Sequence, residues 1–157
     1  MNENLVVMGV AGCGKSTIGF KLAKQLGMPF LDADNFHSDL NLKKMSSGLA
    51  LEDADRLPWL QILKDELNAR SGCVLACSAL KKEYRSILGG CRLPTRFLLL
   101  QISKATVRAR MAGRVGHFMP PSLLESQFDT LEITDDLIVI DAETSEDTVL
   151  SSIAMNL

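Results

Sequence analysis

A glycine-rich segment near the N-terminus has residue types and spacing suited to binding phosphate. Residues 9–16 match the pattern G-x-x-x-x-G-K-[ST], between an apolar run and a helical pattern. In such a P-loop, backbone amides at a helix N-terminus surround phosphate groups, the lysine adds a cation and the serine an oxygen for Mg²⁺. An ordinary glycine-rich turn would not require Lys-Ser at this register. The sequence therefore predicts binding of ATP and Mg²⁺ through Gly9, Val10, Ala11, Gly12, Cys13, Gly14, Lys15, Ser16 and Thr17.

Two carboxylates follow the next apolar run, in the sequence Asp32-Ala33-Asp34. Side chains at i and i+2 of an extended chain point to one side, and open parallel sheets bind ligands at the carboxyl ends of their strands. We expect Asp32 to help Ser16 and water hold the metal ion, because the third predicted strand ends in Cys77-Ser78 without an acid. We expect Asp34 to lie near an acceptor hydroxyl, as a base or an orienting group. The alternative is a pair of solvated carboxylates in a turn.

The segments that must position these groups alternate along the chain between continuous apolar runs and apolar residues at helical spacing. The predicted strands are Leu5–Met8, Pro29–Leu31, Cys73–Cys77, Phe97–Ile102 and Leu137–Ile140. The predicted helices are Lys15–Leu26, Leu57–Ala69 with Pro58 in its first turn, Ala79–Leu88, Val107–Ala112 and Ser122–Leu131, with a last helix from Ser145. This alternation predicts an α/β, P-loop NTPase fold with a five-stranded parallel sheet and helices on both faces. We expect one domain over residues 1–157, with a small lid at about 112–122.

Composition and charge exclude several classes of function. The 157 residues fit one domain, and 46% hydrophobic residues predict a packed core. A net charge of −2 gives no bulk attraction to nucleic acid or an anionic membrane, and no apolar run reaches the roughly 20 residues of a membrane span. The N-terminal residues lack the basic region of a signal peptide, so we expect a cytoplasmic protein. In that compartment the four cysteines are expected to stay reduced.

Several blocks of sequence beyond the P-loop resemble the gluconate kinase family, in the order in which that family has them. Together they cover most of residues 5–141. The first block is shared by many kinases, whereas the blocks around Asp55–Leu60, Ser78–Arg85 and Gly116–Met119 are far more specific. The full set of blocks is Met8–Ser16, Leu31–His37, Asn41–Met45, Gly48 with Leu51, Asp53–Leu60, Cys77–Arg85, Gly116–Met119 and Ser126–Glu132.

The resemblance implies an ATP-dependent phosphotransferase that converts D-gluconate to 6-phospho-D-gluconate. It also implies a nucleoside-monophosphate-kinase-like fold and a homodimer. The acceptor would be a small molecule that carries one carboxylate and a chain of hydroxyl groups, so its site needs cations and hydrogen-bonding groups.

Within this resemblance, four residues besides Asp34 are expected to bind the acceptor from the central part of the chain. Arg56 and Arg85 can each hold a carboxylate with two parallel hydrogen bonds, which a lysine cannot do. Lys81 and His37 add further donors. The alternatives are an ion pair of Arg56 with Asp53 or Asp55 on a helix surface, and a solvated helix face for Lys81, Lys82 and Arg85.

Further basic residues surround the predicted lid. Arg110 and Arg114 are one helical turn apart, and His117 follows them. In a kinase with a lid, such arginines neutralise phosphate charge in the transition state and help to exclude water. We therefore expect Lys15, Asp34, Arg110 and Arg114 to be catalytic and His117 to contact the substrate. A nucleic-acid patch is the competing interpretation, but no set of aromatic residues is interleaved with these charges.

Other nucleotide-binding proteins remain as alternatives. A switch GTPase would carry an Asn-Lys-x-Asp element, which this sequence lacks. A non-catalytic nucleotide-binding module would leave the acidic and basic residues unused. The strongest rival is a small-metabolite kinase of the shikimate-kinase-like or nucleoside-monophosphate-kinase-like type, because it would share the P-loop and the paired aspartates.

Overall fold

The computed structural model describes residues 2–113 and 121–157. Its strands are β1 (Asn4–Met8), β2 (Phe30–Asp32), β3 (Cys73–Ala76), β4 (Thr95–Gln101) and β5 (Leu137–Asp141). Its helices are α1 (Lys15–Leu26), α2 (Asp39–Ser46), α3 (Asp53–Asn68), α4 (Lys82–Gly89), α5 (Lys104–Ala112), α6 (Pro121–Thr130) and α7 (Glu146–Asn156), with a 3₁₀ turn, η1, at Ala33–Phe36.

All five strands form one parallel sheet in the order β2-β3-β1-β4-β5. The predicted α/β fold with a five-stranded parallel sheet is thereby confirmed. β1 lies in the centre, with Val6 opposite Leu75 of β3 and Phe97 of β4. Because β1 is central, the loop that follows it lies in the middle of the sheet's carboxyl edge, where parallel sheets bind ligands.

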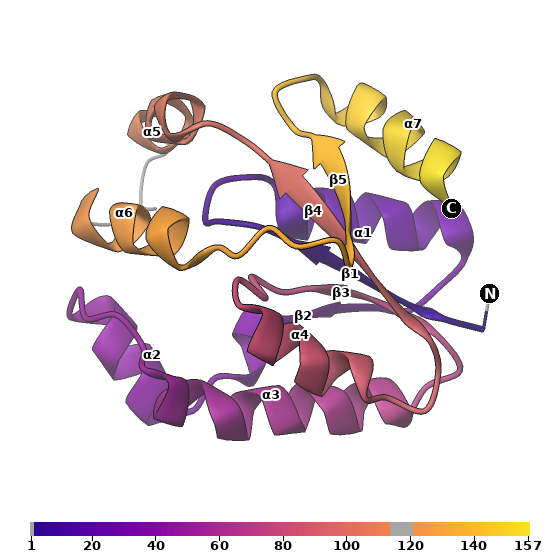
Figure 1. Cartoon of the computed structure of the whole chain (residues 1–157), viewed down its shortest axis with the longest axis horizontal. Helices are drawn as coiled ribbons and strands as arrows, with labels where there is room; N and C mark the ends of the chain where they lie inside the picture. Colours follow the sequence, from indigo (N-terminus) through magenta and orange to yellow (C-terminus); the bar gives the residue numbers. More distant parts are fainter. Residues whose placement is uncertain (1, 114–120) are drawn as a thin grey trace.

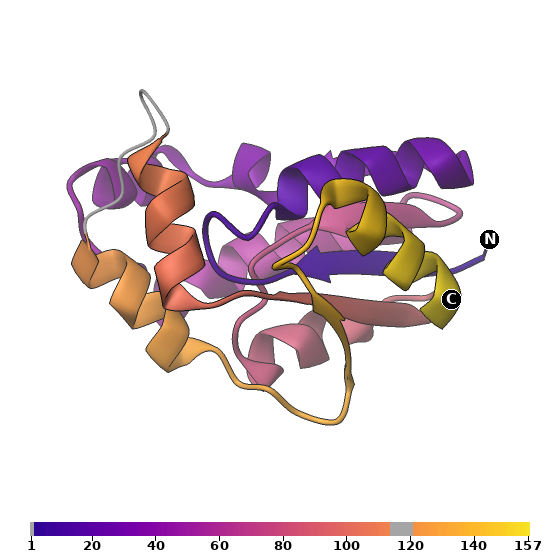
Figure 2. The ribbon, with the colours of Figure 1, turned by 90° about the horizontal axis from the view of Figure 1, so that it is seen from above.

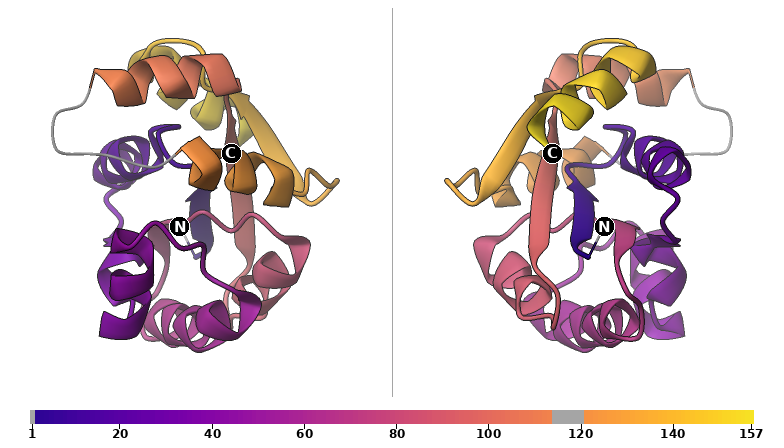
Figure 3. Two further views of the ribbon diagram at one scale, coloured as in Figure 1. Left: turned by 90° about the vertical axis from the view of Figure 1, so that its left-hand side faces the viewer. Right: turned by 90° about the vertical axis from the view of Figure 1, so that its right-hand side faces the viewer.

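Helices cover both faces of the sheet, which explains the continuous apolar strands (Figure 1). Alternate strand residues such as Leu5 and Val7 pack with α1 and α7 on one face, while Val6 and Met8 pack with α3 and α4 on the other. Figure 2 shows α5 and α6 beyond the strand ends, at the opposite end of the molecule from the two termini. An end-on view shows the sheet between its two helical layers (Figure 3).

Some element boundaries differ from the predictions. Helix α3 begins at Asp53, because the Glu52 N–H donates to Asp55 Oδ2 at 2.8 Å and closes its first turn. Pro58 therefore lies in the second turn and not in the first. Helix α4 begins at Lys82, because Ala79 has a φ of +45° and interrupts the helical backbone.

One helix was not predicted from the sequence, and one predicted segment lies mostly outside the described residues. Helix α2 was not predicted; it begins after Ser38, whose side chain accepts a hydrogen bond from the Asn41 N–H at 3.1 Å. The predicted lid at 112–122 falls mostly on residues 114–120, which lie outside the described residues. Of the residues described, no helix is long and apolar enough to cross a membrane.

Candidate active site

The P-loop connects β1 to α1 through backbone conformations that favour glycine. Gly14 caps α1 at a φ of +97°, and Gly9 has a φ of +145°. A Cβ at Gly9 would lie 2.8 Å from Cys13 Sγ and 3.1 Å from the Leu100 carbonyl oxygen. The loop therefore folds tightly over the end of the sheet, with the α1 N-terminus facing outward, as phosphate binding requires. Lys15 Nζ lies 3.4 Å from the Val10 carbonyl oxygen.

The structure brings the two predicted metal ligands together. Ser16 Oγ donates to Asp32 Oδ2 at 2.8 Å, and Asp32 Oδ1 accepts the Asp34 N–H at 3.0 Å. A hydroxyl and a carboxylate are oxygen ligands that suit Mg²⁺, which takes few protein ligands and otherwise binds water and phosphate. The described residues contain no group of three or more His, Cys, Asp or Glu side chains placed to hold a metal ion. This pair therefore fits Mg²⁺ shared with a nucleotide better than a protein-enclosed metal.

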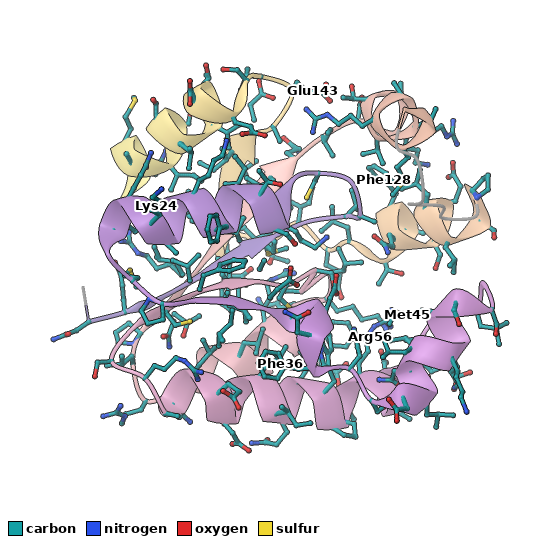
Figure 4. The ribbon with its side chains drawn as sticks, turned by 180° about the vertical axis from the view of Figure 1, so that it is seen from behind. Lys24, Phe36, Met45, Arg56, Phe128 and Glu143 are labelled. Carbon is teal, nitrogen blue, oxygen red and sulfur yellow. The ribbon has the colours of Figure 1, made fainter. Side chains whose placement is uncertain are left out.

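A cavity of about 400 Å³ opens beside the P-loop and extends toward α2 and α3. It has the size of a small-molecule site. In Figure 4, Arg56 and Met45 project toward the same space from α3 and α2. The cavity is lined by Ala11, Lys15, Asp34, His37, Leu42, Met45, Leu49, Ala50, Leu51, Arg56, Trp59, Ser78, Leu80, Leu123, Ser126, Gln127 and Thr130. It thus unites Lys15, the Asp34–His37 segment and Arg56, which come from separate parts of the chain. Because the sequence predicts these residues at the acceptor site, we call it the acceptor cavity.

Arg56 is held in the acceptor cavity by an aromatic residue. Its NH1 donates to the Tyr84 hydroxyl at 3.1 Å, and its guanidinium carbon lies 5.5 Å from the centre of the Tyr84 ring. The alternative of a surface ion pair of Arg56 with Asp53 or Asp55 is not what the structure shows. Asp53 instead pairs with Lys81 and Asp55 with Lys44, each at 2.9 Å. The half-buried Arg56 is therefore available to an anionic ligand.

Tyr84 and Asp53 form a network next to Arg56. The Tyr84 hydroxyl donates to Asp53 Oδ1, and Lys81 Nζ donates to the same oxygen at 2.9 Å. These hydrogen bonds lower the pKa of Asp53, and burial raises the pKa of Tyr84. Lys81 is thus paired with Asp53 beside the acceptor cavity and is not one of the residues that line it.

His37 and Trp59 form part of the cavity wall. Their rings stack with centres 4.2 Å apart, and Trp59 Nε1 donates to the Ala33 carbonyl oxygen at 2.8 Å. The pKa of His37 lies below its ordinary value of 6.5, and burial is the main cause. The charge of Asp34 raises the pKa, and that of Arg56 lowers it. His37 is therefore mainly neutral at pH 7. Its Nδ1 is buried and has no hydrogen-bond partner among the described residues.

Arg85 does not take the predicted place in the substrate site. Only 1% of its side chain is exposed, and it does not line the acceptor cavity. Its guanidinium donates to carbonyl oxygens of Ala79, Leu80 and Glu132, at 2.8 to 3.1 Å, as well as to Thr134 Oγ1 and Asp136 Oδ2. All of its nitrogens are used by these contacts. Its prediction as a substrate ligand was wrong, because the side chain points inward from α4 and joins two loops.

A second cavity of about 310 Å³ lies at the other side of the α1 N-terminus, between α5 and the β5–α7 loop. It is lined by Cys13, Gly14, Thr17, Ile18, Arg110, Ala142, Thr144, Ser145, Glu146 and Val149. Arg110 NH2 donates to the Ala142 carbonyl oxygen at 3.0 Å. Arg110 therefore faces this nucleotide-side cavity rather than the acceptor cavity, and its catalytic role stays a prediction. Arg114 and His117 lie outside the described residues.

The predictions missed residues that other elements bring into the acceptor cavity. Helix α2 and the loop after it contribute Leu42, Met45 and the run 49–51. Ser38 before Asp39 is an N-cap signal that would have found this helix. Gln127 of α6 also lines the cavity. It lies within the Ser126–Glu132 block of the family resemblance, but neither charge nor spacing marks it as a site residue.

The four cysteines are thiols that form no disulfide. Cys73 and Cys77 lie in the core cluster on the face of the sheet that packs against α3 and α4. Burial raises the pKa of Cys73 to about 11 and that of Cys77 to about 12. These two thiols are therefore protonated and unreactive at neutral pH.

Comparisons with known proteins agree with this geometry. A family model described as shikimate kinase matches residues 11–153. A gluconokinase from Gluconobacter oxydans is 44% identical over 156 residues, which cover 95% of this chain and 88% of that protein.

Two solved structures are also similar. A gluconokinase from Sinorhizobium meliloti has a TM-score of 0.89 and 37% identity, over 96% of this chain and 89% of that one. A sugar kinase from Janibacter has a TM-score of 0.91 and 38% identity, over 99% of this chain and 94% of that one. With its P-loop, its sheet order and its acceptor cavity, this chain belongs to the gluconokinase family of P-loop kinases.

Proposed function

We propose that this protein transfers the γ-phosphoryl group of ATP to D-gluconate and forms 6-phospho-D-gluconate. One observation supports this most strongly: a single cavity contains the P-loop cation Lys15, the carboxylate of Asp34 and the guanidinium of Arg56. Lys15 can bind the phosphoryl donor, Asp34 the acceptor hydroxyl and Arg56 the acceptor carboxylate. The gluconokinase relatives support the same substrate.

ATP would bind with its phosphates at the P-loop and its nucleoside toward the nucleotide-side cavity. Backbone amides and the α1 N-terminus hold the phosphates, and Lys15 moves from the Val10 carbonyl oxygen to the γ-phosphate. Arg110 lies beside Gly14 and Thr17, where it can contact the nucleotide. Ser16 and Asp32 would hold Mg²⁺, which supplies positive charge at the phosphate oxygens when bound.

Gluconate would bind with its carboxylate toward Arg56 and its far hydroxyl toward Lys15. Tyr84 holds the Arg56 guanidinium in place, and neutral His37 offers hydrogen bonds to the hydroxyl chain. Asp34 accepts the proton of the attacking hydroxyl while a bond forms between that oxygen and the γ-phosphorus. The bond to the bridging oxygen of ADP breaks in the same transfer. Such a loose transition state depends mainly on positioning and charge stabilisation.

The roles proposed for three further residues are more limited: Lys81, Arg114 and His117. Lys81 supports Arg56 indirectly, through Asp53 and Tyr84. Arg114 and His117 are proposed from the sequence alone to contact the phosphates and the substrate.

An acceptor panel tests the proposed reaction. ADP release is measured with gluconate, shikimate, AMP, CMP and adenylyl sulfate, each with ATP and Mg²⁺, and the phosphorylated product is identified by mass spectrometry. Of these five acceptors, only gluconate is expected to be phosphorylated. Preferential turnover of shikimate would contradict the proposal and favour the rival that the matching family model raises.

We also propose that the protein acts as a cytoplasmic homodimer. The resemblance to gluconate kinases supports the dimer, and the need for ATP supports the compartment. Analytical ultracentrifugation is expected to show a species of twice the 17.2 kDa chain mass, and a monomer at micromolar concentration would contradict the dimer.

A further inference from the structure

A side chain from α6 contacts the backbone of the P-loop. The Ala11 N–H donates to Gln127 Oε1 at 2.7 Å, across 116 residues of sequence. Both residues line the acceptor cavity together with Lys15. Since a P-loop lysine reaches the β- and γ-phosphates, Gln127 lies beside the place where the proposed phosphoryl donor would meet the acceptor.

The chemistry of the amide side chain fixes its orientation. Only the carbonyl oxygen can accept a hydrogen bond from the Ala11 N–H, so Oε1 faces the P-loop. The Nε2 group, with two N–H donors, is held on the same planar amide beside the cavity. A glutamine in this position therefore has one group for the protein and one group for a ligand.

Helix α6 is anchored on both sides of this residue, which keeps the amide in place. Leu124 is 3% exposed in the core, and the partly buried Phe128 packs against the same cluster. Just after the helix, the Glu132 N–H donates to the Leu80 carbonyl oxygen at 2.8 Å. The position of Gln127 relative to Ala11 is thus set by the core and does not depend on a free surface helix.

We infer that Gln127 is a further catalytic residue, whose Nε2 donates a hydrogen bond to the γ-phosphoryl group during transfer. Oε1 holds the Ala11 segment of the P-loop at the same time, so one side chain aligns the phosphate donor with the acceptor cavity. Preorganised donors aimed at developing negative charge stabilise a transition state most strongly. This inference rests on the proposed phosphotransferase function and adds a residue to it.

Two substitutions separate this role from a purely structural one. Gln127→Glu keeps the size of the side chain and an oxygen for the Ala11 N–H, but replaces the donor with a negative charge. Gln127→Leu removes both groups. If Gln127 only tethers the P-loop, the carboxylate of Gln127→Glu keeps the tether and weakens ATP binding by charge repulsion, so kcat at saturating ATP stays close to wild type. Gln127→Leu then has an impaired kcat. If Nε2 donates to the phosphoryl group, kcat falls by about 100-fold in both, and the gluconate KM changes little.

A pH profile gives an independent readout. Protonation of the introduced carboxyl group restores a donor and removes the charge, so kcat of Gln127→Glu relative to wild type is expected to rise as the pH falls from 8 toward about 5. Asp129→Asn, at an exposed position of the same helix, is the matched control and should retain wild-type kinetics. Melting temperatures and ATP-analogue affinity identify any variant that has merely unfolded or lost its nucleotide site.

The outcomes distinguish this inference from the proposed function. An active wild type with an unimpaired Gln127→Glu variant would overturn the role of Gln127 and leave the function intact. A wild type without gluconate-dependent ADP release would contradict the function, and the variants are then compared on the acceptor that the panel identifies. Impairment of both variants, with recovery of Gln127→Glu at low pH, supports the inference.

Discussion

Lys15 is the cation that the P-loop places next to the acceptor cavity. Replacing it with alanine removes one preorganised charge at the transferring phosphoryl group, an effect of about 3 kcal/mol on the transition state. We therefore predict that Lys15→Ala lowers kcat at least about 100-fold while the protein stays folded. Steady-state ADP release and circular dichroism measure the two properties. Near-normal turnover would contradict the P-loop assignment.

Arg56 presents a planar guanidinium to the cavity from its contact with Tyr84. A lysine keeps the charge but cannot make paired hydrogen bonds to a carboxylate. We predict that Arg56→Lys raises the gluconate KM about tenfold or more, by loss of about 1.4 kcal/mol of binding, with a smaller change in kcat. The matched control is Arg70→Lys, just after the end of α3, where Arg70 pairs with Glu66 away from the acceptor cavity. An unchanged gluconate KM would remove Arg56 from the site.

His37 links the acceptor cavity to a pH dependence of stability. Its pKa is lower in the folded protein than the ordinary value of 6.5, mainly because of burial. The unfolded chain therefore binds more protons at this residue as the pH falls below 6.5. Its stabilising contribution is complete above that pH and is lost as the pH falls through the folded pKa.

We predict that wild type loses more stability than His37→Gln between pH 7.5 and pH 5. Urea denaturation at both pH values measures the difference. Comparison with the variant cancels the contribution of the carboxylates, which titrate in both proteins. Equal losses in the two proteins would show that His37 does not titrate with a lowered pKa.

At the scale of elements, α4 is tied to its neighbours by the buried Arg85. Its guanidinium holds the Ala79–Leu80 turn, in which Ala79 has a positive φ, and also the loop between α6 and β5. Ser78 and Leu80 line the acceptor cavity on one side of this contact, and α6 lines it on the other. Arg85 thus supports the cavity wall without reaching the cavity.

We predict that Arg85→Met lowers the free energy of unfolding by about 2–4 kcal/mol, because buried carbonyl groups lose their donors. Urea denaturation measures this value. Lys82→Met, at an exposed position of the same helix, is the control and should change stability by less than about 0.5 kcal/mol. Similar values for the two variants would contradict the structural role of Arg85.

At the scale of the whole molecule, the P-loop separates two cavities. Trp59 is the only tryptophan, and its ring lines the acceptor cavity and stacks on His37, whereas the nucleotide-side cavity lies across the α1 N-terminus. We predict that gluconate changes Trp59 fluorescence in the absence of nucleotide, and that a non-hydrolysable ATP analogue alone changes it much less. Arg56→Lys should shift the gluconate titration to higher concentration. A larger response to the nucleotide alone would contradict the assignment of the two cavities.

The sequence by itself determined the features that short-range patterns control. The register of Gly9, Gly14 and Lys15 predicted a phosphate loop, because only glycine readily adopts its backbone angles and the pattern places the lysine at the helix start. Continuous apolar runs predicted the five strands. In the inner strands β1, β3 and β4 these runs are buried, since residues covered on both faces show no alternation. Asp32 could be placed beside Ser16, because the end of β2 and the start of α1 both lie at the sheet's carboxyl edge.

Only the tertiary structure decided what the longer-range contacts control. The sequence favoured Arg85 as a ligand because an arginine in a helical block looks the same whether it faces solvent, a ligand or buried carbonyl groups. Gln127 was missed because its partner, Ala11, lies 116 residues away, and no local periodicity encodes such a contact. The environment of a polar side chain depends on which elements pack around it. Burial and hydrogen-bond partners therefore distinguish Gln127, which lines the acceptor cavity, from Arg85, which supports the cavity wall.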